Sequence, residues 1–175
     1  WKVIDTKWPG FEEAFRGFDP RVLLALEDHE VSALEQDTSI VRNAGKIRAV
    51  LDNAGFITDI AATHGSFGRW VADWPGDDIT GLWAVLKDSG ARLGGDTGPR
   101  MLRKMGKDTF ILSNDVVAAL VALGVVTKKP TSKADLRAVQ AAFNQWRVES
   151  GRELGAISMT LALTVASPSP AEHDA

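Results

Sequence analysis

Apolar side chains recur every three or four residues along most of this chain, a spacing that places them on one face of an α-helix. Between residues 43 and 65, the apolar residues with this spacing are Ile47, Val50, Leu51, Ala54, Ile57 and Ile60. Alternation with a period of two, bounded by turn pairs, is weak throughout the sequence. The pattern therefore predicts an all-α protein, a compact bundle of about nine or ten short helices joined by tight turns.

Capping and breaking residues predict where these helices begin and end. Asp19 followed by Pro20 is typical of a helix start, and the segment that follows predicts two short helices that break near Asp28. Further boundaries are predicted at Asn43, Gly65, Ser66, Pro75, Gly90, Ser113 or Asn114, and Ser132. A last helix is predicted within residues 153–165. We expect residues 1–166 to form one helical domain, or two lobes around a cleft, followed by a flexible tail at 167–175.

The composition narrows the classes of site that the chain can hold. It has 175 residues and no cysteine, which excludes disulfides and thiolate metal sites. The three histidines, His29, His64 and His173, are scattered without ligand spacing, so we expect neither a metal nor a cofactor. No apolar run reaches the roughly 18 residues of a membrane span. A cytoplasmic protein without a membrane partner is therefore expected.

A glycine-rich segment carries the clearest chemical signal. Residues 92–117 read RLGGDTGPRMLRKMGKDTFILSNDVV. Consecutive glycines permit positive φ angles and a close approach of the backbone to a ligand. A helix that begins near Thr97 would point its N-terminal N–H groups at an anion. Phosphate is the natural candidate because four cations follow on the next turns, namely Arg100, Arg103, Lys104 and Lys107. The alternative is an ordinary turn with a solvated basic face, and the formal net charge of −3 keeps that alternative open.

An acidic residue follows the glycines at the start of an apolar helix. Asp115 lies 20 residues after Gly95. One interpretation is that Asn114 or Asp115 is the N-cap of that helix, which is a common use of such residues. A catalytic role for Asp115 is compatible with that position, and the spacing alone does not decide between the two.

The order L-G-G, G-P-x-x-L and then GKDTFILSxDVV resembles the helix-hairpin-helix DNA glycosylases. In that superfamily a glycine hairpin grips the DNA backbone, and an aspartate lies beside the sugar of the flipped nucleotide. The resemblance implies that Asp115 is the catalytic aspartate and that Leu93 belongs to the hairpin. It implies DNA-backbone binding by Gly94, Gly95, Thr97, Gly98, Arg100 and Lys104.

Residues 15–54 are similar to the 3-methyladenine DNA glycosylase I family, which shows F-D-P, then I-(I/V)-R-(N/H)-x-x-K-I-x-A, then N-A. The matching residues are Phe18, Asp19, Pro20, Ile40, Val41, Arg42, Asn43, Lys46, Ile47, Ala49, Asn53 and Ala54. The resemblance implies that Trp1 lines the pocket for the damaged base. The zinc site that is usual in that family is absent, because this chain has no cysteine.

The two resemblances imply a DNA repair enzyme that hydrolyses the N-glycosidic bond of an alkylated purine such as 3-methyladenine after base flipping. No lysine stands where bifunctional members carry a nucleophile, which implies a monofunctional enzyme. The expected partner is damaged double-stranded DNA, and the expected state is a monomer acting at the bacterial nucleoid. The alternatives are a helix-hairpin-helix DNA-binding module without activity and a purely structural helical domain.

The other tryptophans are interpreted as core residues. Trp70, Trp74, Trp83 and Trp146 stand at helical spacing beside other apolar side chains. In the helix predicted from Ser132, an apolar stripe is formed by Leu136, Val139, Phe143 and Trp146.

Overall fold

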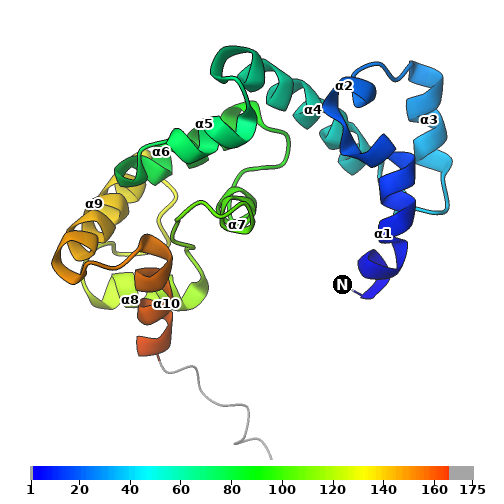
Figure 1. The fold of residues 1–175 in the computed structure, drawn as a ribbon. Coiled ribbons are helices and arrows are strands. Elements are labelled where there is room, and N and C mark those ends of the chain that lie inside the picture. The colour runs from blue at the N-terminus through cyan, green and yellow to red at the C-terminus, as the bar shows by residue number, and fades with distance from the viewer. Residues whose placement is uncertain (1, 166–175) are drawn as a thin grey trace, which may run out of the picture. The chain divides into compact units, whose positions relative to one another are not determined.

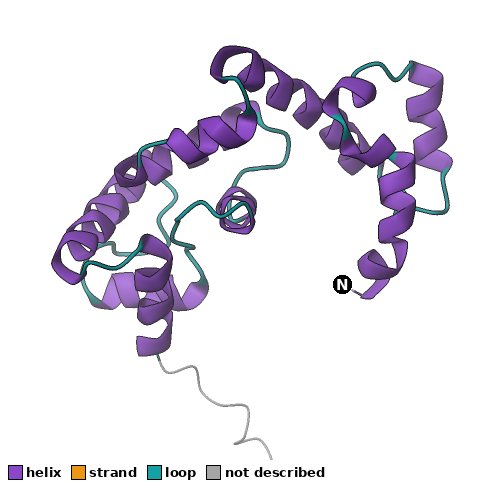
Figure 2. Ribbon diagram, viewed as in Figure 1, coloured by secondary structure: helices purple, strands orange, loops and turns teal. Residues whose placement is uncertain are grey.

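The chain is all-α, as the apolar pattern predicts. The structure is a computed structural model and describes residues 2–165 of the 175 (Figure 1). Every regular element within those residues is a helix (Figure 2). The α-helices are α1 (Lys2–Ala14), α2 (Pro20–Leu23), α3 (Asp28–Gln36), α4 (Ala44–His64), α5 (Phe67–Asp73), α6 (Ile79–Ser89), α7 (Thr97–Lys104), α8 (Asn114–Ala122), α9 (Lys133–Ser150) and α10 (Leu154–Thr164). Two short 3-10 turns are η1 (Arg16–Phe18) and η2 (Gly76–Asp78).

Two expectations fall on residues outside the described range. These are the pocket residue Trp1 and the tail at 167–175. Within residues 2–165, no helix is both long enough and apolar enough to cross a membrane.

The chain divides into two compact units. Unit 1 comprises residues 1–73 with 86–93, and unit 2 comprises 74–85 with 94–175. Helix α6 contributes to both, since its first part belongs to unit 2 and its last turn to unit 1. The single domain expected over residues 1–166 stays a prediction.

Unit 1 is built around the long helix α4. Its predicted N-cap is confirmed, because the Asn43 side chain accepts a hydrogen bond from the Lys46 N–H at 3.0 Å. Gly65 ends α4 with a φ of +83°, a value that favours glycine. Asp19 caps α2 in the same way, accepting from the Arg21 N–H at 2.9 Å. The buried core is formed by Phe15, Leu23, Leu34, Ile40, Ile47 and Ala54.

Unit 2 has an aromatic core. The Phe110 ring stacks on Phe143 with centroids 4.1 Å apart and meets Trp83 edge-on at 4.7 Å. A buried polar link joins α6 to α9, because the Gln140 side chain accepts from the Thr80 N–H at 3.0 Å. Of the four tryptophans expected in the core, Trp70 and Trp83 are buried. Trp74 and Trp146 are only half-buried, so the expectation is confirmed for two of the four.

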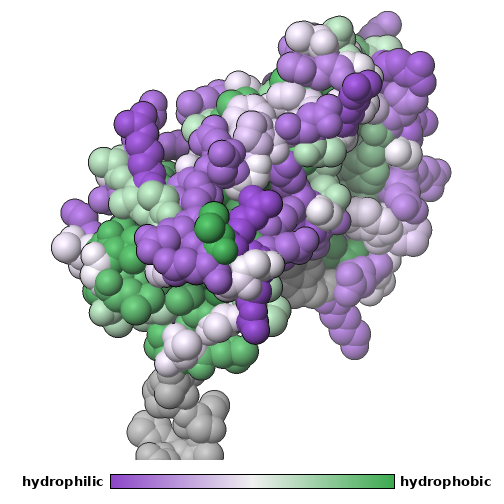
Figure 3. Space-filling model, turned by 60° about the vertical axis from the view of Figure 1, so that its left-hand side comes forward, coloured by the Kyte–Doolittle hydropathy of each residue, from purple (hydrophilic) through white to green (hydrophobic). Residues whose placement is uncertain are grey.

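Helix α10 is unusual among the described helices because it carries no charged side chain. Leu154, Ile157 and Ser158 are buried where it packs against α8 and α9. Met159 and Leu163 on its other side are 63 % and 80 % exposed. Figure 3 accordingly shows apolar side chains gathered around the C-terminal end of this helix.

Candidate functional site

The glycines of the sequence motif form a bend that leaves open space in front of its backbone. Gly95 has a φ of +61°, and an added Cβ there would meet nothing within 4 Å. Gly94 accepts a hydrogen bond from the Thr97 N–H at 3.4 Å, which turns the chain into α7. We call residues 94–98 the glycine bend. Residues 95–97 are exposed, and the backbone at Gly95 meets the geometric requirement for close contact with an extended ligand.

Helix α7 places a buried face on unit 2 and a basic face on its surface. Gly98, Pro99 and Leu102 are buried, whereas Arg100 and Lys104 are exposed. The Arg100 guanidinium makes no hydrogen bond or ion pair with any residue in the 2–165 range. The Asp96 side chain, immediately before the helix, makes no capping bond that would compete with an anion. The Arg100 guanidinium is therefore available to an anionic ligand.

Two other cations of the motif have structural roles. The Arg103 guanidinium donates to the Thr109 carbonyl at 2.7 Å. The Lys107 ammonium donates to the Trp74 carbonyl at 2.6 Å. Both groups therefore hold backbone segments of unit 2 together.

Asp115 is the second residue of α8, half-buried, and it is not the N-cap. Ser113 has that role, because its side-chain oxygen accepts from the Val116 N–H at 3.3 Å. The alternative in which Asn114 or Asp115 caps the helix is therefore wrong. Within the described residues, the Asp115 carboxylate has no hydrogen-bond or ion-pair partner. A negative charge in the first turn of a helix is favoured by the helix dipole.

We expect Ser113→Ala to lower the free energy of unfolding by about 1 kcal/mol, because α8 loses its N-cap hydrogen bond. Asp115→Asn should change it by less than that, because the capping bond does not involve position 115. Urea denaturation of the two variants measures both values. A larger loss with Asp115→Asn than with Ser113→Ala would restore a structural role for the carboxylate.

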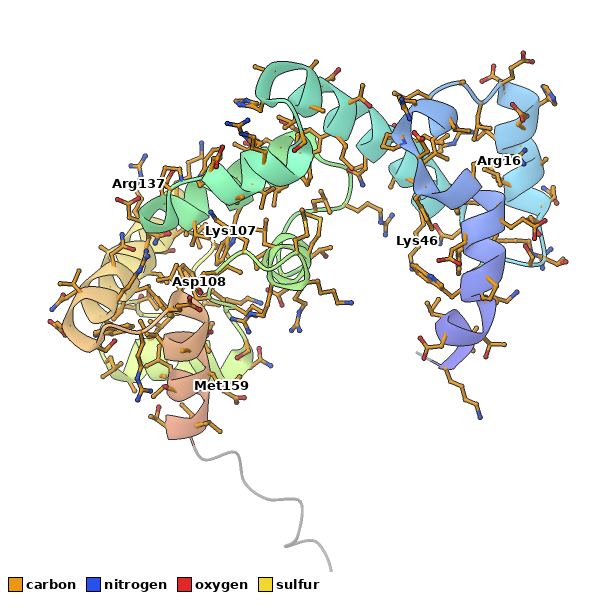
Figure 4. All side chains as sticks on the ribbon, viewed as in Figure 1. Arg16, Lys46, Lys107, Asp108, Arg137 and Met159 are labelled. Carbon is orange, nitrogen blue, oxygen red and sulfur yellow. The ribbon has the colours of Figure 1, made fainter. Side chains whose placement is uncertain are left out.

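A segment without helix joins α7 to α8, and we call residues 105–113 the connector. The Asp108 carboxylate accepts from the Leu154 and Gly155 N–H groups, each at 2.8 Å. It thereby caps α10, whose own N-cap residue makes no side-chain bond. Figure 4 labels Asp108 at the first turn of this helix. The Trp83 indole N–H donates to the Thr109 hydroxyl at 3.2 Å, which fixes the next residue of the connector.

The sequence gives no direct sign of these connector contacts. Asp108 is 46 residues from Leu154. The only local signal is that the last predicted helix begins after Glu153 without a serine, threonine, aspartate or asparagine to cap it.

In unit 1, Asn53 holds the chain just ahead of the glycine bend. Its amide donates to the Ala91 carbonyl at 3.0 Å and accepts from the Ala91 N–H at 2.8 Å. The sequence pattern includes Asn53 but assigns it no role. Lys46 is solvent-exposed, and the exposed Arg48 guanidinium lies 3.5 Å from the Glu35 carboxylate.

Two surface cavities of unit 2, of about 290 and 550 Å³, lie elsewhere. The smaller is lined by Asp77, Asn144, Arg147 and Val148. The larger lies between the end of α9 and α10 and includes Trp146 and Leu161. Neither is lined by Asp115 or by the glycine bend. No group of histidine and acidic side chains within residues 2–165 is arranged to hold a metal ion.

This chain is similar to proteins described as methyladenine glycosylases. A family model described as methyladenine glycosylase matches residues 1–132. DNA-3-methyladenine glycosylase 1 of Escherichia coli (strain K12) is 35% identical over 54 residues, which are 31% of this chain and 29% of that protein. A crystal structure of 3-methyladenine DNA glycosylase I (TAG) aligns with 26% identity and a TM-score of 0.46, over 55% of this chain and 63% of that one. The chain therefore spans less than two thirds of the length of either relative.

Proposed function

The chain belongs to the methyladenine glycosylase family, and we propose that it hydrolyses the N-glycosidic bond of an alkylated purine, such as 3-methyladenine, in duplex DNA. The observation that carries this proposal is the family match over residues 1–132, which includes the glycine bend, α7 and Asp115. The target base must leave the stack before the bond can be reached, and damage lowers the cost of that step.

In this proposal the glycine bend and α7 form a helix-hairpin-helix grip on the DNA backbone. The residues that hold phosphates are Gly94, Gly95, Thr97, Gly98, Arg100 and Lys104. The open space in front of Gly95 and the exposed Arg100 support this assignment. Such contacts position the duplex without reading its sequence.

Asp115 acts on the flipped nucleotide. As the base departs with the electrons of the C1′–N bond, positive charge develops on the sugar, and a nearby carboxylate stabilises it. Water then adds to C1′ and loses a proton. Trp1 stacks on the electron-poor alkylated base, as an aromatic face does on a cation.

The enzyme is monofunctional in this proposal. Lys107 is the first lysine after the proposed grip in the sequence. Its ammonium donates a hydrogen bond to the Trp74 carbonyl. That bond supports a structural role for Lys107 over attack on the sugar. We further propose that the protein acts as a monomer and at the bacterial nucleoid, where its substrate lies.

Incubation with alkylated duplex DNA tests the function directly. We expect release of free 3-methyladenine, and 7-methylguanine release measured in the same chromatogram reports selectivity. The DNA left behind should carry intact abasic sites rather than strand breaks. Tight binding to abasic DNA with no base released would instead identify a DNA-binding module without activity.

Arg100→Gln should weaken DNA binding at every sequence tested and reduce the slope of log affinity against log salt by about one. The reason is that one phosphate contact, and the counterion it releases, is lost. Fluorescence anisotropy over a series of salt concentrations measures the slope. An unchanged slope would exclude Arg100 from the phosphate grip.

A further inference from the structure

Helices α9 and α10 begin after residue 132, where the match to the family ends. Despite this, α10 makes polar contacts with the connector, in addition to those that Trp83 and Arg103 make with Thr109. This raises the question of what α10 does for the site, given that it carries no charged side chain that could touch DNA.

The path of the connector determines how α7 and α8 are placed relative to each other within unit 2. It joins α7, which carries the proposed phosphate contacts, to α8, which carries Asp115. Its first residues bond back into α7, ending with the Lys107 N–H on the Leu102 carbonyl at 3.0 Å, whereas residues 108–112 belong to no helix. Its course must therefore be fixed by contacts with other elements, since a displacement of about 1 Å in a catalytic group can reduce a rate 10²-fold.

Helix α10 contacts the connector at two points. The first is Asp108, which accepts two N–H bonds from the start of α10. At this point a Cβ on Gly155 would lie 3.4 Å from the Asp108 carboxylate, at van der Waals contact.

The second point is Ser158, and it lies nearer to Asp115 in sequence. The Ser158 hydroxyl accepts from the Ile111 N–H at 3.1 Å and donates to the Ile111 carbonyl at 3.2 Å. A single side chain thus satisfies both polar groups of one connector residue, and it is 3% exposed. Ile111 precedes the capping residue Ser113 by two positions and Asp115 by four.

We propose that Ser158 is a positioning residue for the glycosylase reaction, fixing the connector at Ile111 and thereby the location of Asp115 relative to the DNA grip. The proposal rests on the proposed function. Ser158 itself does not touch substrate, because its hydroxyl is buried and both of its hydrogen bonds go to Ile111. It acts through the backbone that leads into α8.

Ser158→Ala tests this role with single-turnover kinetics at saturating enzyme, which are independent of the fraction of protein that is active. We expect the rate of base release to fall on the order of 10- to 100-fold. Affinity for a duplex containing an abasic-site analogue should stay within about twofold, since the glycine bend and Arg100 are untouched. The matched control is Thr160→Ala on the same helix, where the hydroxyl donates within the helix to Ala156 at 3.0 Å. It should keep the wild-type rate.

A double-mutant cycle with Asp115→Asn identifies the group through which Ser158 acts. If Ser158 positions Asp115, adding Ser158→Ala to Asp115→Asn should lower the rate no further. Additive losses would overturn the proposal, as would a lower melting temperature with an unchanged saturating rate, or a parallel loss of DNA binding. Should Ser158→Ala fail to fold, Asp108→Asn weakens the same attachment and is expected to give the same pattern.

The proposed function and the positioning role of Ser158 are contradicted by different results. A wild-type protein that releases no base from alkylated DNA contradicts the proposed function and this inference with it. An active wild type whose rate is unaffected by Ser158→Ala contradicts the positioning role alone.

Discussion

Replacement of Asp115 by asparagine is expected to lower the saturating rate of base release by about 10²- to 10³-fold, with DNA affinity unchanged. The asparagine keeps the size of the side chain but removes the charge that would stabilise the developing sugar cation. The carboxylate has no protein partner within the described residues and the capping bond of α8 belongs to Ser113, so the fold should survive. Single-turnover assays with alkylated duplex DNA measure the rate.

Asp88→Asn is the matched control, because Asp88 is an exposed carboxylate on α6. It should release base at the wild-type rate. Release by Asp115→Asn at the wild-type rate would mean that Asp115 is not catalytic. The positive charge of an alkylated purine, which makes it a good leaving group, would then carry more of the reaction. That outcome would leave the glycosylase assignment intact and move the catalytic contribution to the base pocket.

Local rules predicted most of the helix boundaries in this chain. Asp19, Asn43, Ser113 and Ser132 were expected at or near helix starts, and each side chain accepts a hydrogen bond from the first turn. Capping depends on residues two or three positions apart, so it can be read from sequence. Where the pattern left a choice between Ser113 and Asn114, the geometry of one hydrogen bond decided it.

Helix α1 is the element that the pattern does not predict. Pro9 lies inside it and is followed by Gly10, and both residues disfavour a helix interior. The structure shows what offsets this cost. A Cβ at position 10 would lie 2.7 Å from the Ser39 carbonyl, so the glycine allows α1 to approach the turn before α4 closely. Tertiary packing of this kind is absent from any local window of the sequence.

In the candidate site, too, local features are predicted from the sequence and long-range contacts are not. The glycine bend, the basic face of α7 and Asp115 are each local features, and the sequence indicates all three. The roles of Asp108, Ser158 and Asn53 are not indicated, because each side chain bonds to backbone 38 to 47 residues away. The residues of the proposed grip and the proposed catalytic carboxylate are indicated by local sequence, whereas the long-range contacts of Asp108, Ser158 and Asn53 depend on the folded structure.

Gly95→Ala is expected to raise the dissociation constant for DNA about tenfold, which corresponds to roughly 1.4 kcal/mol. Gly95 has a φ of +61°, so alanine there introduces backbone strain. Its Cβ would also project into the open space in front of the bend, where the proposal places a phosphate. Loss of close approach should weaken binding, while the saturating rate of base release stays near that of the wild type. Anisotropy with abasic-analogue duplex and single-turnover kinetics measure the two quantities.

Gly124→Ala is the control that distinguishes the effect of backbone strain from the loss of a DNA contact. Gly124 follows α8, has a φ of +72°, and also has nothing within 4 Å of an added Cβ. The backbone cost is therefore similar at the two positions, and both variants should lose comparable thermal stability. Only Gly95→Ala should lose affinity for DNA, because only position 95 belongs to the proposed grip. Equal affinity losses would show that strain spreads through unit 2, and wild-type affinity in Gly95→Ala would place the phosphates elsewhere.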